Sequence, residues 1–176
     1  MKYFTGRGDE GETSLASGRV PKTDPTVKAM GELDELNSFI GNALAKVGFQ
    51  HRITSDLKEV EKNIYLINSE LSGYMEKVKG KDISPISEKT VKELEETMAS
   101  YSELVKYVPK FSYPNGTELA TTLNICRAIA RRAERSVAEI DPKNKNILAY
   151  TNRLSSFFYM LFRFANSVGK YEEEFF

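Results

Sequence analysis

The sequence has one cysteine, one histidine, no tryptophan and no long apolar run. Cys126 alone cannot form an internal disulfide, and a single histidine, His51, excludes Cys/His zinc sites and helix-borne Glu-x-x-His di-iron sites. A serine or cysteine hydrolase triad is disfavoured for the same reason. Apolar stretches fall short of the roughly 20 residues that span a bilayer, and the N-terminus lacks a signal-peptide apolar region. We therefore expect a cytoplasmic protein with no membrane segment.

The chain also has no excess of charge of either sign, because 25 Lys and Arg balance 25 Asp and Glu. No overall field then draws the chain to nucleic acid or to an anionic membrane, so any anion site must be local. A length of 176 residues suits one domain with a single sizeable core.

Helical periodicity dominates the chain after an N-terminal arm, residues 1–24, that is rich in glycine and shows neither strand nor helix period. Apolar residues at three- and four-residue steps predict five helices, at about 26–48, 53–74, 87–105, 117–140 and 147–169. The apolar positions of the second predicted helix follow a strict seven-residue repeat. The predicted fold is all-α, a single-domain five-helix antiparallel bundle over 25–170 with an irregular glycine-rich arm. The acidic-aromatic tail, 171–176, either docks or is disordered, and the sequence favours neither.

The run from Cys126 to Arg135 places four arginines and a glutamate in a helical pattern. At about 100° per residue, Arg127, Arg131 and Glu134 share one sector beside an apolar stripe. Guanidinium forks match phosphate oxygens two at a time, so the run suits a polyanion such as a triphosphate. A solvated basic face explains the run equally well.

The arm itself, from Thr5 to Ser14, has the chemistry of a phosphate cradle, in which small residues let backbone N–H groups approach oxygen. It is not a Walker loop, because Glu12 stands where lysine is required and no strand feeds it. A flexible leader is the alternative.

Three further patterns extend the candidate site. Asp34 lies beside Gly31, Ser38 and Gly41 on a small-residue face of the first helix, and a carboxylate there would pair with Arg127 if the arginine helix packs alongside; an exposed surface aspartate is the alternative. On the last helix a polar stripe could meet a ligand, another subunit or water. A phenylalanine-rich run on the same helix suggests burial beyond one bundle core, hence oligomerisation. The stripe is Asn152, Ser156, Tyr159 and Arg163, and the run is Phe157, Phe158, Phe162 and Phe164.

The loop 111–116 carries two aromatic side chains, Phe111 and Tyr113, just before the arginine helix. They would serve a planar macrocycle, but spacing alone favours a hydrophobic staple over the helix start.

Four segments, in order and spacing, resemble the motifs of the PduO-type ATP:corrinoid adenosyltransferases, and together they span the chain. They are 3–13, 31–41, 126–135 and 150–155. The resemblance implies a homotrimer of five-helix bundles that binds ATP between subunits. It also implies transfer of the 5′-deoxyadenosyl group of ATP to the Co(I) of a reduced corrinoid, cob(I)alamin, which gives adenosylcobalamin and triphosphate.

The resemblance also assigns residues. One subunit would hold the triphosphate through its arm, with Thr5, Gly6, Arg7, Gly8, Thr13, Ser14 and Lys22. The next subunit would contribute Arg131, Arg132, Glu134, Arg135 and Asn152. Arg127 would pair with Asp34 between subunits, and Phe111 would lie under the corrin ring to keep the lower axial base off cobalt. The catalytic set is then Arg131, Arg127, Asp34 and Phe111, with no metal ligand assigned.

The implied mechanism is direct displacement by Co(I) at the ribose 5′ carbon, with cationic groups, backbone N–H groups and Mg²⁺ stabilising the leaving triphosphate. A Co(II) reductase and a downstream cobalamin-dependent enzyme are the implied partners. Two other functions stay open: an ATP-binding helical bundle that senses or interacts without transfer, and a basic helix on nucleic acid, against which the zero net charge argues.

Overall fold

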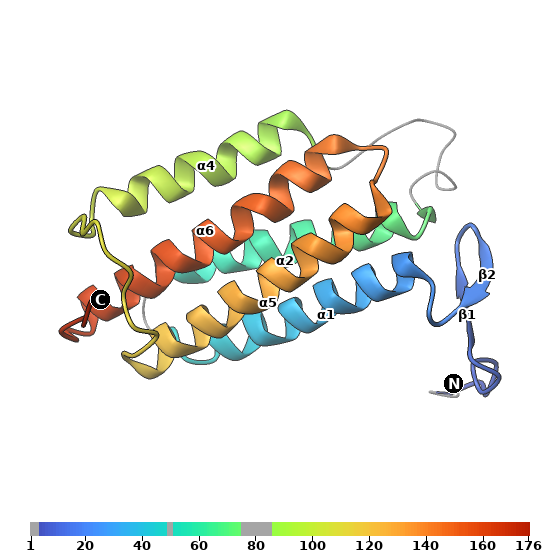
Figure 1. The fold of residues 1–176 in the computed structure, drawn as a ribbon, viewed down its shortest axis with the longest axis horizontal. Helices are drawn as coiled ribbons and strands as arrows, with labels where there is room; N and C mark the ends of the chain where they lie inside the picture. Colours follow the sequence, from blue (N-terminus) through green and yellow to red (C-terminus); the bar gives the residue numbers. More distant parts are fainter. Residues whose placement is uncertain (1–3, 49–50, 75–85) are drawn as a thin grey trace.

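Five helices carry the fold in the computed structural model, which describes residues 4–48, 51–74 and 86–176. The helices are α1 (Pro25–Leu44), α2 (His51–Leu71), α4 (Glu88–Ser102), α5 (Glu118–Ile140) and α6 (Lys145–Val168). They lie side by side with their axes roughly aligned (Figure 1). The predicted helical bundle is confirmed. Within these ranges, no helix is both long and apolar enough to cross a membrane.

Short polar side chains begin four of the helices. The side-chain oxygens of Asp24, Ser87, Thr117 and Asn144 each accept a hydrogen bond from a backbone N–H in the first turn of α1, α4, α5 and α6. These bonds satisfy donors that have no partner inside the helix. At its other end, α5 stops at Asp141, whose φ is +44°, directly before Pro142.

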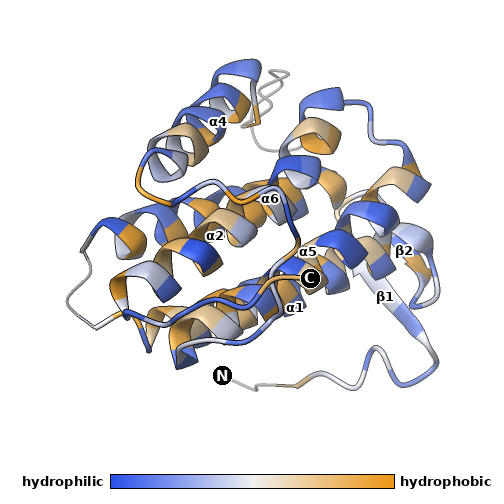
Figure 2. Ribbon diagram, turned by 60° about the vertical axis from the view of Figure 1, so that its left-hand side comes forward, coloured by the Kyte–Doolittle hydropathy of each residue, from blue (hydrophilic) through white to orange (hydrophobic). Residues whose placement is uncertain are grey.

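The core forms where the predicted apolar stripes face one another. On α2 the heptad positions from Ile53 to Ile67 are buried, whereas Tyr74, beyond the helix, is 56% exposed. On α5 the stripe of Cys126, Ala130 and Ala133 is buried as well. Figure 2 shows hydrophobic and hydrophilic residues alternating around the helices, as expected for amphipathic elements.

The phenylalanine run on α6 is buried by its own chain. Phe157, Phe158 and Phe162 are at most 1% exposed, and Phe164 packs edge-on against Tyr101 with the ring centroids 4.9 Å apart. The run is therefore accounted for by the core of a single chain, and it gives no support for oligomerisation. The central position of α6, flanked by α4 and α5, provides apolar neighbours on several sides (Figure 1).

Ion pairs fix how α1 lies against α5. They occur at three levels along the two helices, and their order runs in opposite directions in the two sequences, so the helices are antiparallel. The pairs are Lys28–Glu139 at 3.2 Å, Arg132 with both Glu32 and Glu35, and Lys46–Glu118 at 3.3 Å. Exposed pairs of this kind add little stability each, but they specify register.

The arm contains a β-hairpin that the sequence analysis did not predict. β1 (Glu12–Leu15) pairs antiparallel with β2 (Gly18–Pro21), and the N–H of Ala16 in the turn donates to the carbonyl oxygen of Ser72 at 2.9 Å. Strands of four residues are too short to show a clear alternation of apolar and polar positions. The arm extends beyond the N-terminal end of α1, and Tyr3 of its motif lies outside the described residues (Figure 1).

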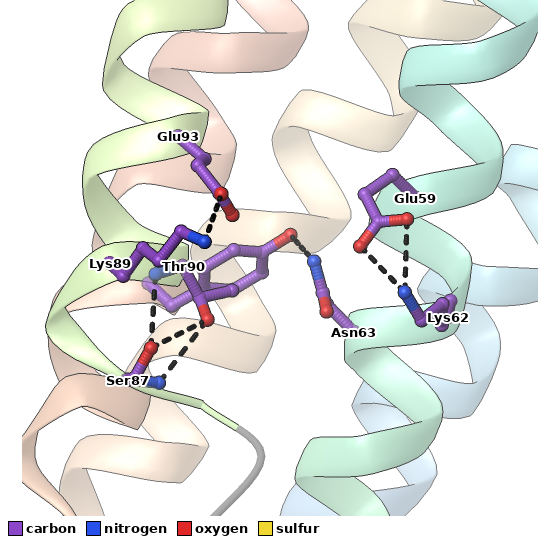
Figure 3. A network of polar contacts seen from close by, with 8 residues as sticks. Glu59, Lys62, Asn63, Ser87, Lys89, Thr90 and Glu93 are labelled. Carbon is purple, nitrogen blue, oxygen red and sulfur yellow. Dashed lines mark hydrogen bonds and ion pairs between the residues drawn. The ribbon is translucent and has the colours of Figure 1, made fainter.

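A buried hydrogen bond links α2 to α6. The side-chain amide of Asn63 donates to the phenol oxygen of Tyr150 at 3.1 Å, and these residues are 5% and 1% exposed. Figure 3 shows Asn63 reaching toward the phenol, with the Ser87–Thr90 capping box of α4 nearby. Because both groups are shielded from water, neither has an equivalent alternative partner.

Replacing Tyr150 by phenylalanine tests this link. We expect Tyr150→Phe to lower the free energy of unfolding by about 1–2 kcal/mol, because the Asn63 amide loses its acceptor. Tyr65→Phe is the matched control, since Tyr65 is 63% exposed on α2 and should change stability little. Chemical denaturation measures both. Equal stability of the two variants would contradict a role for the buried bond.

The lone cysteine offers a second test of the packing. Burial raises the pKa of the Cys126 thiol to about 12, so at pH 8 about one thiol in 10,000 is ionised in the folded chain. Because the thiolate is the reactive species, alkylation by iodoacetamide should be far slower in the native protein than in concentrated guanidinium chloride. Equal rates would show that Cys126 is accessible.

Candidate nucleotide and corrinoid site

Three arginines on one face of α5 have no acidic partner in the part of the chain that the structure describes. We call Arg127, Arg131 and Arg135 the arginine stripe. Arg127 Nε donates to the Asn124 side-chain oxygen at 2.8 Å, and Arg135 donates to the backbone oxygen of Arg131 at 2.8 Å. Within the described ranges, no carboxylate lies within ion-pairing distance of the stripe. The stripe therefore concentrates positive charge in a chain whose formal net charge is zero.

Arg132 differs from its neighbours, because its guanidinium binds two carboxylates of α1. Nε donates to Glu32 and a terminal nitrogen donates to Glu35, and these hydrogen bonds raise the pKa of Arg132 further above its ordinary value. One residue further along a helix means about 100° of rotation, which turns Arg132 away from Arg131 and toward α1. In this chain Arg132 connects two helices.

A polar chain next to the stripe orients Asn152. The Asn152 amide donates to Glu134 at 2.6 Å, and its oxygen accepts from Arg153 at 3.0 Å. Arg153 in turn pairs with Glu95 of α4 at 2.9 Å. The arrangement fixes the amide of Asn152 beside α5 and assigns Glu134 a partner in its own chain.

Asp34 lies on an open face of α1. It is exposed and forms no ion pair with any described residue, and the predicted pairing with Arg127 inside one chain is wrong. The reason is geometric, since Glu32 and Glu35, not Asp34, are on the side of α1 that faces α5. A Cβ added at Gly31 would meet nothing within 4 Å, so another protein surface could approach closely here.

Glycines shape the arm around a lysine. Gly6 and Gly11 have φ of +69° and +82°, a region that favours glycine. The N–H of Lys22 donates to the Gly11 oxygen at 2.8 Å, and its ammonium lies so close to Gly8 that an added Cβ would be 3.1 Å from Nζ. The fold thus gathers a flexible cation and a backbone free of side chains at one place.

The remaining predicted arm residues lie around this turn. Thr5 accepts a hydrogen bond from the backbone N–H of Arg7 at 3.4 Å, while Thr13 and Ser14 belong to β1. Arg19, which the sequence analysis missed, binds Glu12 at 2.9 Å and the Arg7 carbonyl oxygen at 3.1 Å. No sequence signal singles it out, because its role depends on the hairpin.

Phe111 is exposed at the other end of the molecule. It is 75% exposed, and its ring stacks on Phe176 with the centroids 6.1 Å apart, while Tyr113 is 5.0 Å from the same ring. The staple interpretation is wrong, because the two aromatics pack on the final segment of the chain. In a single chain the arm lies at one end of the bundle and the end of α6, where this segment begins, lies at the other (Figure 1).

The structure therefore gathers the predicted residues into three groups. The first is the arm group, formed by Thr5, Gly6, Arg7, Gly8, Thr13, Ser14 and Lys22. The second is the helix group, formed by Arg127, Arg131, Arg135, Glu134 and Asn152. The third is the aromatic group around Phe111. Asp34 and Arg132 are outside all three, on α1 and at its contact with α5.

Comparisons with known proteins agree on one family. Residues 3–165 match the family model described as cobalamin adenosyltransferase. The corrinoid adenosyltransferase of Bacillus subtilis strain 168 is 35% identical over 184 residues, which cover 99% of this chain and 93% of that protein. The human corrinoid adenosyltransferase MMAB is 30% identical, with 93% of this chain and 68% of the human protein covered.

Solved structures give the same result. A variant of the PduO-type ATP:corrinoid adenosyltransferase from Lactobacillus reuteri, complexed with cobalamin and ATP, superposes with a TM-score of 0.89. It is 29% identical, and the match covers 99% of this chain and 96% of that one. Another variant of that enzyme, complexed with ATP, has a TM-score of 0.85 at 29% identity over 98% of this chain and 99% of that one. The chain belongs to the cobalamin adenosyltransferase family.

Proposed function

We propose that this chain transfers the 5′-deoxyadenosyl group of ATP to the Co(I) of cob(I)alamin or a related corrinoid. The cobalt electron pair forms the Co–C bond, the bond from C5′ to the triphosphate oxygen breaks, and that electron pair leaves with the triphosphate. No protein group needs to form a covalent bond. The protein's work is to orient the reactants and to stabilise the charge that develops on the leaving group.

The arginine stripe is the observation that carries this proposal. Three guanidinium groups on one face, with no carboxylate partner among the described residues of their own chain, suit a polyanion that arrives with the substrate. Arg131 is the central group, and we assign it to the triphosphate together with Arg135, with the oriented Asn152 and Glu134 beside it. Arg132 holds α1 against α5, because its guanidinium group donates hydrogen bonds to Glu32 and Glu35.

The arm supplies the second half of the triphosphate site. The phosphate cradle combines backbone N–H groups with hydroxyls and cations. The N–H groups lie around Gly6 and Gly8, the hydroxyls belong to Thr5, Thr13 and Ser14, and the cations are Arg7 and Lys22. Since the arm extends away from its own bundle (Figure 1), we infer that it serves the stripe of a neighbouring subunit. The complexes of the Lactobacillus reuteri enzyme with cobalamin and ATP support both substrates.

A homotrimer with ATP between subunits would meet this requirement. In it the open face of Asp34 receives Arg127 of the neighbouring chain. This pairs a carboxylate and a guanidinium that have no such partner among the described residues of one chain. Cyclic assemblies join two different faces at each contact, as this arrangement needs.

Phe111 is assigned to the corrin ring. A large aromatic surface exposed to water is unfavourable, and the Phe111 ring is 75% exposed and held from one side by Phe176. A ring packed under cobalt would keep the lower axial base away and ease reduction to Co(I).

Mg²⁺ is assigned no protein ligand. It binds phosphate oxygens and water with few carboxylates, so we expect it to enter with ATP. In residues 4–48, 51–74 and 86–176, no three His, Cys, Asp or Glu side chains are placed to hold a metal ion. A Co(II) reductase that delivers the electron, a cobalamin-dependent enzyme that takes the product, and a cytoplasmic location complete the proposal.

Arg131→Ala tests the assignment of the stripe. Loss of a charge-assisted contact to the triphosphate should lower kcat/KM about tenfold to a hundredfold. The measurement is the optical change on adenosylcobalamin formation, with ATP and corrinoid under a strong reductant. Lys92→Ala, an exposed cation on α4, is the control. Full activity of Arg131→Ala would contradict the site, and ATP binding by the native chain without transfer would favour the sensor function.

A charge swap tests the inter-subunit pair. Asp34→Arg should weaken trimer association about tenfold or more, because it faces Arg127 of the next chain with a like charge. The double variant Asp34→Arg/Arg127→Asp should recover much of the association. Sedimentation velocity over a concentration series measures the effect, and Glu96→Arg on the exposed side of α4 is the control. A double variant as weak as the single one would remove the pair from the interface.

A further inference from the structure

The final segment of the chain is joined to the Phe111 loop by backbone hydrogen bonds. The N–H of Tyr113 donates to the Glu174 oxygen at 2.9 Å, and the N–H of Phe176 donates to the Phe111 oxygen at 3.1 Å. Between them Ser112 and Phe175 form an antiparallel bridge. Phe111 therefore belongs to a short two-stranded ribbon whose second strand is residues 174–176.

One buried ion pair ties this ribbon to the bundle. Arg163 on α6 donates to Glu173 at 2.7 Å, with 7% and 13% of the two side chains exposed. A second guanidinium nitrogen donates to the Lys106 carbonyl oxygen at 3.0 Å, and the ring of Phe175 lies 5.2 Å from the guanidinium carbon. Arg163 thus contacts both the final segment and the loop that leads to Phe111.

The Arg163–Glu173 pair is the buried charged contact among the bonds that hold the segment. The pair borders a cavity of about 240 Å³, lined also by Val105, Val108 and Tyr171. The pair matters to the docked segment, because removing one partner leaves the other charge buried and unpaired.

We propose that Arg163 and Glu173 are positioning residues for Phe111. The pair anchors residues 171–176 on the loop, and Phe176 at the end of the ribbon holds the Phe111 ring from one side while most of Phe111 stays exposed for the corrinoid. Neither residue touches a substrate. The role toward the corrinoid rests on the proposed function, whereas the anchoring itself does not.

A single fluorophore reports the anchoring directly. The chain has no tryptophan, so Phe176→Trp introduces the only one. Its steady-state anisotropy should be high when the segment is docked and should fall clearly when Glu173→Gln is added. Glu172→Gln is the matched control, because it removes the same charge one residue away from an exposed position, and it should leave the anisotropy unchanged.

Kinetics separate positioning from general stability. In the chain without the reporter, Glu173→Gln should raise KM for the corrinoid about tenfold and leave KM for ATP unchanged. Phe176→Ala removes only the ring that supports Phe111 and, at a largely exposed position, should fold and reproduce the corrinoid effect. Glu172→Gln should match the parent.

Three results would overturn the proposal. They are an anisotropy unaffected by Glu173→Gln, an equal rise of KM for both substrates, and an unchanged corrinoid KM in Phe176→Ala. A parent chain that forms no adenosylcobalamin would overturn the proposed function and with it the corrinoid role. The anisotropy would still decide whether the ion pair anchors the segment.

Discussion

Unneutralised positive charge on one face of α5 is the constraint on which the functional account depends. The guanidinium groups of Arg127, Arg131 and Arg135 are within a few turns of one another, so each adds to the positive potential of the others. Water and salt screen this repulsion at a solvated surface, and a bound polyanion would attract all three guanidinium groups. The adjoining apolar stripe of α5 is buried in the core, which holds the helix in place.

The bundle places the three groups of proposed site residues at different positions along its length. The hairpin holds the arm beyond the start of α1, the stripe occupies the middle of α5, and the ribbon of Phe111 and Phe176 lies where α6 ends. In the proposed reaction, the first two groups meet near the third. One chain alone does not bring its arm to its own aromatic ribbon, so assembly is the simplest way to complete the site. Asp34 on its open face is then the natural contact.

Much of the fold follows from interactions between residues that are close together in the sequence. Periodic apolar positions such as Ile53 to Ile67, and caps such as Ser87, predict the helices because their effects act within a few residues. The arginine sector is also a local property, and the side of α5 that bears Arg131 was predicted. Resemblance to a family added the arm and Phe111, which local rules leave ambiguous.

Long-range contacts were the part that could not be predicted. The sequence does not distinguish Arg132 from the neighbouring arginines. Only the packing of α1 against α5 shows that Arg132 forms ion pairs with Glu32 and Glu35. Likewise Arg163 read as part of a polar stripe, yet it is buried against Glu173 after the chain turns back at Lys170, whose φ is +55°. The hairpin was not predicted for a related reason. Its strands are stabilised by pairing with each other and by one hydrogen bond from Ala16 to Ser72, and neither contact leaves a pattern in the sequence.

Complementation between two variants of reduced activity tests the shared site most directly. Lys22→Ala damages the arm and Arg131→Ala damages the stripe, and the two proteins are unfolded, mixed in equal amounts and refolded together before adenosylcobalamin formation is measured. If each site combines the arm of one chain with the stripe of another, about one site in three of every mixed trimer carries neither defect. That is about a quarter of all sites after random refolding, and activity should return to about that fraction. If both parts came from one chain, every site would keep one defect, and a mixture no more active than its components would contradict the account.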